Sequence, residues 1–238
     1  MIRLAPYIAS RSALSRRQAE RAILEGRVTV NGVVWRDFLI DSHSEVVLDG
    51  RSVSVLPSPM LWSYFKPRRQ IVTRHDPQGR TTVFDVLRTY VPDGPLLTVG
   101  RLDYDSEGLL LVSNSPTLVH MLETSPMERC YTVHVHGCMK ETHLERIRRG
   151  CTYEGIHYRP CAIKVQKRQG KNGILKIVLT EGKNREIRRL MRSAHLSVAR
   201  LMRQSFGPFA LCQGQKPGTL VDLNLSLLRK NSLFQNIC

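Results

Sequence analysis

The sequence contains no long hydrophobic segment. Its longest purely aliphatic run covers residues 109–112, Leu-Leu-Leu-Val, whereas a membrane-spanning helix needs about 20 apolar residues. A secretory signal peptide needs a continuous apolar stretch near the start of the chain. Four arginines interrupt that region here: Arg3, Arg11, Arg16 and Arg17. We therefore expect neither a membrane anchor nor a cleaved leader.

The sequence also lacks the cysteine spacing of a zinc or disulfide protein. None of its six cysteines belongs to a Cys-x-x-Cys pair, which argues against a zinc site of that type. The chain is too long, and its cysteines too irregularly spaced, for a disulfide scaffold. We expect reduced thiols in a cytoplasmic protein and no metal site.

Acidic residues are scarce relative to basic ones. The chain has 20 Asp and Glu against 36 Lys and Arg, which gives a formal net charge of +16. A hydrophobic fraction of 42% argues against a disordered chain, and 238 residues suggest one or two domains. A folded protein this basic usually binds a polyanion, most commonly nucleic acid. A basic surface that only maintains solubility is the alternative.

Residues 15–26 predict a short helix with both ends marked. Ser15 can cap its start, Gln18 completes a capping box, and Gly26 fits a left-handed stop. Asn31-Gly32 follows between two β-rich runs and predicts a hairpin. Three arginines lie away from the apolar stripe of the helix: Arg16, Arg17 and Arg21. They could form an ordinary solvated face or contact an RNA backbone.

A proline-rich stretch divides the chain. Residues 53–56 predict the last strand of a first domain, and Pro57-Ser58-Pro59 follows. Prolines this dense cannot join a sheet ladder or a helix interior, so they predict a linker. We expect a first domain over residues 1–56, a linker over 57–61, a second domain over 62–230 and a tail over 231–238.

Three acids lie close together in residues 98–114. Gly100 and Gly108 bracket a polar segment, and the apolar run 109–112 predicts a strand covered on both faces. Ser115-Pro116 then predicts the start of a helix. The acids Asp103, Asp105 and Glu107 are therefore expected on a loop beside a buried strand, a common place for catalytic groups. They could instead cap the loop's own amides or pair with local arginines, and the residues alone do not indicate which one would react.

Two later segments have clear periodicity. Residues 130–135 alternate as a strand that contains Tyr131, which taken alone would be a core residue. From Asn184 an amphipathic helix is expected. Its apolar positions are Ile187, Leu190, Met191 and Ala194, and its basic positions are Arg185, Arg188, Arg189 and Arg192. A face of one charge repels itself without an anionic partner.

These motifs resemble a known family. The N-terminal segment, with Ser15-Arg16-Arg17 and Val30-Asn31-Gly32, resembles the RNA-binding domain named after ribosomal small-subunit protein four. Gly100-Arg101-Leu102-Asp103, followed by Ser106-Glu107-Gly108, resembles the loop of RNA pseudouridine synthases of the RsuA/RluB group. Residues 76–85 resemble the RluB branch more than the RsuA branch. One departure is Arg68-Arg69-Gln70 after Lys66-Pro67, where the family often has glycine.

The resemblance implies roles for particular residues. Asp103 corresponds to the family's nucleophile, Arg101 helps to hold the flipped-out nucleotide, Tyr131 stacks on the target base and Arg188 reaches Asp103. An extruded base suits an aromatic platform because every base has a π-face. Further RNA contacts are expected from eight basic residues: Arg3, Arg16, Arg17, Arg21, Lys66, Arg80, Arg185 and Arg189.

The resemblance also implies a fold and a reaction. The expected fold is α+β: a small helix-plus-hairpin domain, then a mostly antiparallel mixed sheet with flanking helices. The expected reaction isomerises uridine to pseudouridine in ribosomal RNA, with large-subunit RNA favoured as the target. The enzyme is expected to act as a monomer in a bacterial cytoplasm. No cofactor, metal or membrane is expected to take part. The alternatives are a small-subunit target, a ribosome-assembly factor with a vestigial catalytic domain, and a glycosylase that releases the base.

Overall fold

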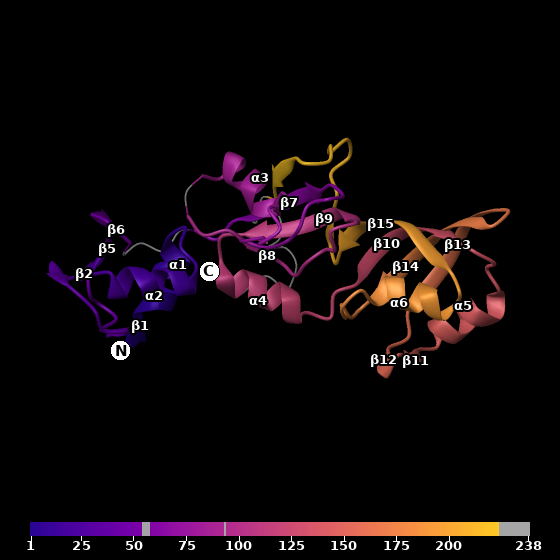
Figure 1. The fold of residues 1–238 in the computed structure, drawn as a ribbon, viewed down its shortest axis with the longest axis horizontal. Coiled ribbons are helices and arrows are strands. Elements are labelled where there is room, and N and C mark those ends of the chain that lie inside the picture. The colour runs from indigo at the N-terminus through magenta and orange to yellow at the C-terminus, as the bar shows by residue number, and fades with distance from the viewer. Residues whose placement is uncertain (54–57, 93, 224–238) are drawn as a thin grey trace.

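The computed structural model describes residues 1–53, 58–92 and 94–223. Most of the expected strand at 53–56, the first linker residue Pro57 and the expected tail at 231–238 lie outside the described residues. In Figure 1 the N-terminal module lies at one end, β7 and β9 lie in the middle, and β13 and α5 lie at the other end. Within the described ranges, no helix has the length and apolar character to cross a membrane.

Within residues 1–53, the N-terminal module contains two helices and two small sheets. Its helices are α1 (Leu4–Arg11) and α2 (Arg16–Leu24). Its strands are β1 (Ile2–Arg3), β2 (Val28–Val30), β3 (Val33–Val34), β4 (Leu39–Ile40), β5 (Val46–Leu48) and β6 (Arg51–Ser52). They form a sheet in the order β3-β2-β5-β6 and a separate pair, β1-β4. Both helices bury their apolar sides against the strands, so this module has its own core.

The ends of α2 are as the sequence predicts. The Ser15 hydroxyl accepts a hydrogen bond from the amide of Gln18, and the Gln18 side chain accepts one from the amide of Ser15. Gly26 adopts a φ of 74° just after the helix, and Asn31-Gly32 turns the β2–β3 hairpin with φ values of 51° and 81°. Helix α1 was not predicted, because the residue before it, Arg3, is not one of the residue types that cap helices.

The capping box gives a testable prediction for local stability. Replacement Ser15→Ala leaves the first amides of α2 without their side-chain acceptor and should cost about 1 kcal/mol. We expect amide hydrogen exchange in α2 to accelerate about fivefold, the factor that corresponds to this energy. Ser42→Ala, at an exposed turn of the same module, is the control. Equal exchange in both variants would contradict the prediction.

The rest of the chain is organised around one large sheet. Within the described ranges, nine strands form it, in the order β13-β14-β10-β15-β9-β7-β17, with β16 beside β15 and β8 beside β9. The pairs are antiparallel except for β9 and β15, which run parallel. The strands are β7 (Leu61–Lys66), β8 (Leu97–Thr98), β9 (Ser106–Ser113), β10 (Arg129–His136), β13 (Ala162–Gln169), β14 (Asn172–Leu179), β15 (Ser197–Phe206), β16 (Phe209–Ala210) and β17 (Leu220–Asp222).

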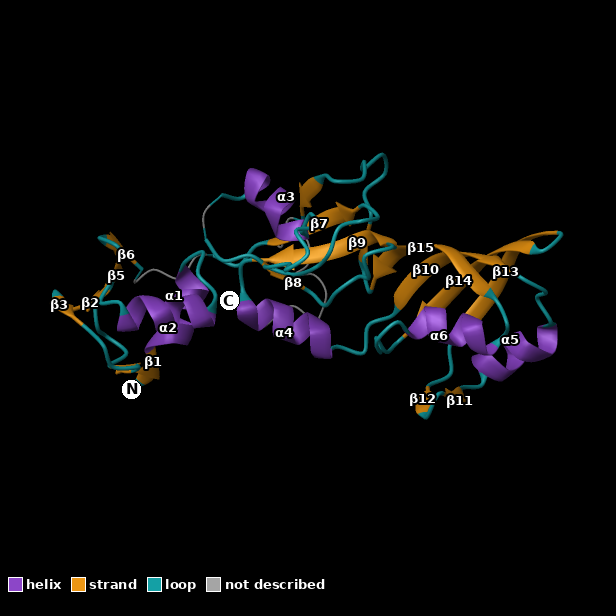
Figure 2. Cartoon of the chain, viewed as in Figure 1, coloured by secondary structure: helices purple, strands orange, loops and turns teal. Residues whose placement is uncertain are grey.

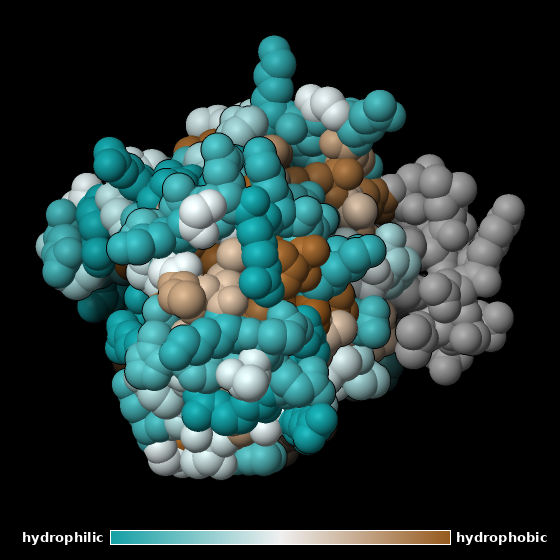
Figure 3. Space-filling model, turned by 90° about the vertical axis from the view of Figure 1, so that its right-hand side faces the viewer, coloured by the Kyte–Doolittle hydropathy of each residue, from teal (hydrophilic) through white to brown (hydrophobic). Residues whose placement is uncertain are grey.

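Helices cover both faces of the sheet (Figure 2). They are α3 (Val83–Tyr90), α4 (Pro116–Thr124), α5 (Glu141–Arg148) and α6 (Glu186–Ser193), and a separate hairpin joins β11 (Cys151–Tyr153) to β12 (Ile156–Tyr158). Figure 3 looks onto the end of the molecule that carries β13 and α5, whose surface is mainly hydrophilic with a smaller hydrophobic area near its centre. The predicted fold, a small RNA-binding-type domain followed by a mostly antiparallel mixed sheet with flanking helices, is confirmed.

Strand β9 is buried along its whole length. Leu109 and Leu111 pack with α4 in one core, whereas Leu110 and Val112 pack with α3 in another. Successive side chains of a strand point to opposite faces, so the apolar run is covered on both sides as predicted. The loop that precedes β9 is therefore joined to a rigid, buried strand.

Candidate active site

Gly108 lies at the pairing of β9 with β15, in the middle of the large sheet. Gly108 lies on β9 opposite Arg203 of the parallel strand β15, and it adopts a φ of 105°. A Cβ atom at this position would lie 2.2 Å from the carbonyl oxygen of Arg203, a distance at which the two strands could not pair. Gly108 is thus required by the close approach of β15, which the sequence did not reveal.

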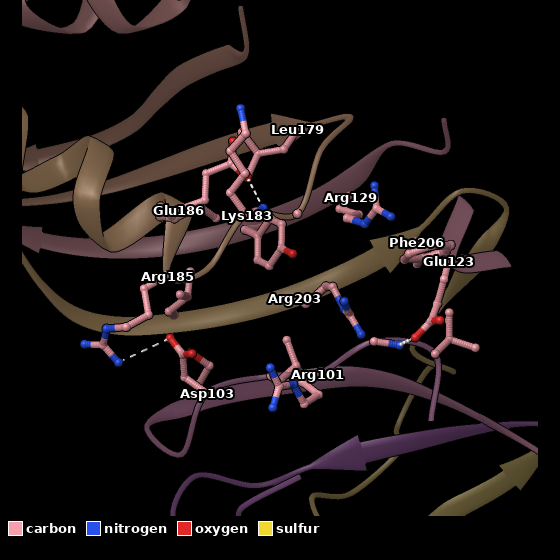
Figure 4. A pocket seen from close by; sticks show the side chains of 18 residues that line it. Arg101, Asp103, Glu123, Arg129, Leu179, Lys183, Arg185, Glu186, Arg203 and Phe206 are labelled. Atoms are coloured by element: carbon pink, nitrogen blue, oxygen red, sulfur yellow. Dashed lines mark hydrogen bonds and ion pairs between the residues drawn. The ribbon is translucent and has the colours of Figure 1, made fainter. Parts of the chain in front are cut away.

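Asp103 lies on the loop before β9 and faces the start of α6. Its Oδ2 atom is 3.4 Å from Nε of Arg188 and 3.6 Å from Nη1 of Arg185. Figure 4 shows the ion pair with Arg185 at one end of the pocket. The Asp103 side chain is about a quarter exposed (27%), so a substrate can reach it. The predicted approach of Arg188 to Asp103 is present in this geometry.

The sequence predicts the three acids together on one loop, but in the structure they lie in different environments. Strand β9 begins at Ser106, so Glu107 is part of the strand and not of the loop. Glu107 is buried and pairs with Arg200 of β15, whereas Asp105 is exposed. Of the three carboxylates, Asp103 is the one that lines the cavity described next.

A cavity of about 320 Å³ opens beside Asp103. Tyr131 lines it from β10, and Arg101 lines it from the loop. Tyr131 is nearly buried (9% exposed), while Arg101 is exposed. The structure therefore brings Asp103, Arg101 and Tyr131 to one cavity, with Arg188 beside Asp103.

The position of Lys66 contradicts its expected contact with RNA. It is fully buried, and its Nζ atom donates to the carbonyl oxygens of Pro67 (2.9 Å) and Ser106 (2.7 Å). Burial lowers the pKa of Lys66 to about 8, against the opposing effect of Asp103 and the neighbouring acids. A side chain in this position supports the loop from inside and cannot contact an RNA backbone.

The other expected RNA contacts occupy varied environments. Four of them are exposed on the N-terminal module: Arg3, Arg16, Arg17 and Arg21. Arg80 binds both oxygens of Asp76, and Nη1 of Arg189 lies 4.0 Å from the carboxylate of Glu154. The anionic partners of the basic α6 face therefore come in part from within the chain. RNA binding by these arginines stays a prediction.

Helix α6 begins at Glu186, two residues later than predicted, because Arg185 adopts a left-handed conformation with a φ of 50°. Glu186 lines the cavity from a buried position, and its Oε2 atom accepts a hydrogen bond from the amide of Lys183 (2.9 Å). Burial, and next the hydrogen bond with Glu181, raise the pKa of Glu186 to about 7. The sequence did not indicate this pair of glutamates.

The raised pKa of Glu186 predicts a pH-dependent stability. Between the ordinary value of 4.5 and about 7, the folded chain keeps a proton that the unfolded chain releases, so stability falls as the pH rises through this window. Glu186→Gln removes the titration, and the variant should gain stability relative to the parent between about pH 5 and 8. Thermal unfolding across that range measures it, with Glu20→Gln on the exposed side of α2 as control. A constant difference at every pH would contradict the prediction.

Comparison with known proteins identifies the family. Residues 62–193 match the family model described as RNA pseudouridylate synthase, and residues 2–37 match the S4 domain. The chain belongs to the RNA pseudouridylate synthase family. It is therefore an isomerase with RNA as its partner, and the resemblance noted in the sequence is confirmed.

Relatives of this pseudouridylate synthase cover most of the chain. A Rickettsia felis protein named uncharacterized RNA pseudouridine synthase is 37% identical over 234 residues, which cover 97% of this chain and 100% of that protein. The Yersinia pestis protein named ribosomal large subunit pseudouridine synthase B is 34% identical over 223 residues, covering 89% of this chain and 69% of that protein.

A solved structure supports the fold of this pseudouridylate synthase. The crystal structure described as pseudouridylate synthase has a TM-score of 0.64 and 22% sequence identity, and it covers 97% of this chain and 99% of that chain. At this identity the likeness shows the fold. The roles of individual residues depend on the geometry described above.

Proposed function

We propose that this pseudouridylate synthase converts a uridine of large-subunit ribosomal RNA to pseudouridine, with Asp103 as the catalytic nucleophile. The single observation that carries the proposal is that Asp103 and Tyr131 line one cavity while Arg188 lies beside Asp103, the three coming from distant segments of the chain. We further propose a cytoplasmic location and action as a monomer.

The reaction sets simple requirements. The bond between N1 of uracil and C1′ of ribose breaks, the base turns, a bond from C5 to C1′ forms, and the proton of C5 is lost while N1 gains one. No net oxidation occurs, and no group is transferred to another molecule, so the proposed reaction requires no oxidant and no acceptor. It requires a carboxylate to act on the nucleotide and a pocket that holds the base while it turns. The base must leave its stack, which costs a few kcal/mol in a duplex and less in a loop.

The residues of the site fit these requirements. Tyr131 offers an aromatic surface in the cavity that Asp103 also lines, and aromatic platforms stabilise extruded bases by about 1–3 kcal/mol per base. Arg185 and Arg188 compensate the charge of the Asp103 carboxylate and attach it to α6. Arg101 is exposed at the rim, where it can hold the extruded nucleotide.

The choice of the large subunit rests on relatives. The Yersinia pestis protein and a Vibrio cholerae protein that is 36% identical over 219 residues are both named ribosomal large subunit pseudouridine synthase B. The sequence of residues 76–85 supports the same branch. The exposed arginines of α2 provide a second surface for the RNA backbone, which would make binding sensitive to salt.

An in vitro assay tests the proposal. Unmodified transcripts of both ribosomal RNAs are incubated with the purified protein and mapped by carbodiimide-blocked reverse transcription. We expect one new stop, in the large-subunit transcript. A stop in the small-subunit transcript would overturn the proposed target, released uracil would indicate a glycosylase, and no product at all would favour an RNA-binding assembly factor.

A further inference from the structure

Two buried arginines line the same cavity as Asp103. Arg129 of β10 and Arg203 of β15 are 9% and 4% exposed. Both guanidinium groups lie over the ring of Phe206, with their central carbons 4.6 Å and 5.7 Å from its centroid. In Figure 4 they lie on the side away from the Asp103–Arg185 ion pair. The cavity thus has the Asp103–Arg185 ion pair at one end and the two buried arginines, with Glu123 near them, at the other.

Neither arginine has a carboxylate partner among the described residues. Arg129 donates to the carbonyl oxygens of Met127 (3.1 Å) and Thr180 (3.0 Å), and Arg203 donates to that of Leu109 (2.7 Å). Neutral carbonyl groups satisfy donors but do not compensate a positive charge. Removing a charge from water costs several kcal/mol unless it is paired, and the carbonyl groups and the Phe206 ring carry no opposite charge that would pair with these two guanidinium groups.

Other arginines of the chain are paired even where burial does not demand it. Arg27 binds Asp49, and Arg148 binds Glu141 and Glu145. The protein therefore has acids available for its surface arginines, whereas it leaves the two buried ones uncompensated. Such an arrangement indicates that the missing anion comes from a ligand.

The acids that line the cavity do not supply this anion. Asp103 faces Arg185 and Arg188, and the carboxylate of Glu123 accepts a hydrogen bond from the amide of Gly100 (2.8 Å). Glu186 accepts a hydrogen bond from the amide of Lys183 (2.9 Å), and within the described residues it forms no ion pair with either arginine.

A second observation points to the same conclusion. The Nη2 atom of Arg203 is buried and has no hydrogen-bond partner within the part of the chain that the structure describes. A buried donor without a partner costs about 1–3 kcal/mol, and more when it is charged. Figure 4 shows the Arg203 side chain in the pocket between Arg129 and Arg101, where a ligand acceptor could satisfy it after a small rotation.

The register of the sheet relates these arginines to the proposed base platform. Tyr131 is paired with Arg203 across β10 and β15, so their side chains share one face. Arg129 lies two residues before Tyr131 on β10 and shares that face as well. A group bound by the arginines would therefore lie next to a base stacked on Tyr131, as the phosphate and base of one nucleotide do.

We propose that Arg129 and Arg203, with Arg101 at the rim, bind a phosphate group attached to the ribose of the target uridine. The inference rests on the proposed function, in that a uridine occupies the cavity. A phosphate supplies the missing negative charge, and its oxygens match the forked geometry of guanidinium groups. A carbonyl oxygen of the base would satisfy a donor but leave both charges uncompensated.

Binding of small uridine compounds tests the inference without turnover. Uridine 3′,5′-bisphosphate and uridine are titrated into the full chain at low salt, and dissociation constants are measured by NMR. We expect the parent to bind the bisphosphate at least about tenfold more tightly, the factor for one charge-assisted hydrogen bond of about 1.4 kcal/mol. Arg203→Met and Arg129→Met should lose most of this preference and keep their affinity for uridine.

Controls separate the site from the basic surface. Arg149→Met, at an exposed position directly after α5, should keep the full preference. Arg203→Lys keeps the charge without the fork and should retain part of it, and Arg101→Met, at an exposed position, tests the site if a buried variant fails to fold. Thermal unfolding checks that each variant is folded.

Three results would overturn the inference: no preference for the bisphosphate in the parent, equal loss of uridine and bisphosphate affinity in the arginine variants, or an equal loss in Arg149→Met. Either of the first two results would indicate that the arginines bind a carbonyl oxygen of the base or only stabilise the fold. The third would indicate that the basic protein surface attracts the bisphosphate without a specific site. If the preference depends on Arg203 but no pseudouridine forms on any RNA, the phosphate site stands and the proposed function fails.

Discussion

Replacement of Asp103 by asparagine is expected to abolish pseudouridine formation while RNA affinity stays within a few-fold of the parent. The amide is nearly isosteric with the carboxylate, so the loop should keep its shape. It carries no negative charge and cannot act as the nucleophile that the reaction requires. Activity is measured on ribosomal RNA with the purified variant, and affinity is measured by filter binding.

Asp105→Asn is the matched control for this experiment. Asp105 lies on the same loop, but its side chain is exposed, and its carbonyl oxygen is the atom that accepts a hydrogen bond from Arg188 (3.4 Å). The substitution should change the turnover rate by no more than a few-fold. Measurable turnover by Asp103→Asn would show that Asp103 is not the nucleophile, and an equal loss in Asp105→Asn would show that the loss is not specific to Asp103.

Gly108→Ala is expected to destabilise the catalytic domain by more than about 3 kcal/mol and to abolish activity with it. Its positive φ alone costs an L residue about 1–3 kcal/mol. The added Cβ would also lie 2.2 Å from the Arg203 carbonyl oxygen, so β9 and β15 would have to separate. Asp103 precedes β9, and Arg203 lies on β15. If the two strands separated, these two residues would no longer line the same cavity.

A second glycine isolates the effect of close approach. Gly214 also has a positive φ, of 76°, but a Cβ atom there would meet no atom within 4 Å. Gly214→Ala should therefore cost only the backbone strain, about 1–3 kcal/mol. Thermal and urea unfolding compare the two variants. Equal stability of Gly108→Ala and Gly214→Ala would refute the tight β9–β15 contact.

Features with local causes could be predicted from the sequence. The capping box of α2, the Asn31-Gly32 turn and the buried run of β9 each depend on residues within a few positions of one another. Local hydrogen bonds and turn geometry determine these elements, so the sequence contains their causes directly. The site residues Asp103, Tyr131 and Arg188 came instead from the family resemblance.

Features that depend on distant pairing could not be predicted. The parallel contact of β9 with β15 joins residues about a hundred positions apart, and it determines both the need for Gly108 and the burial of Arg203. The burial of Lys66 beneath the loop has the same kind of cause. A Lys-Pro pair does not show whether the lysine faces solvent or the core, so the assignment of Lys66 to RNA contact was wrong.

The division into domains is partly a prediction still. The matched regions, 2–37 and 62–193, lie inside the expected domains at 1–56 and 62–230 without fixing their boundaries. The proline-rich stretch begins within residues that the structure does not describe, so the linker at 57–61 stays a prediction, except that its last residue, Leu61, is the first residue of the buried strand β7. Limited proteolysis that cuts first within 57–61 would support it.

The central claim is that this pseudouridylate synthase modifies a uridine of large-subunit ribosomal RNA in the cell. Total ribosomal RNA from cells with and without the gene, mapped by carbodiimide-blocked reverse transcription, tests it most directly. We predict that one stop in the large-subunit RNA disappears without the gene and returns with the parent gene but not with Asp103→Asn. An unchanged map at every position, or a lost stop restored by Asp103→Asn, would contradict the account.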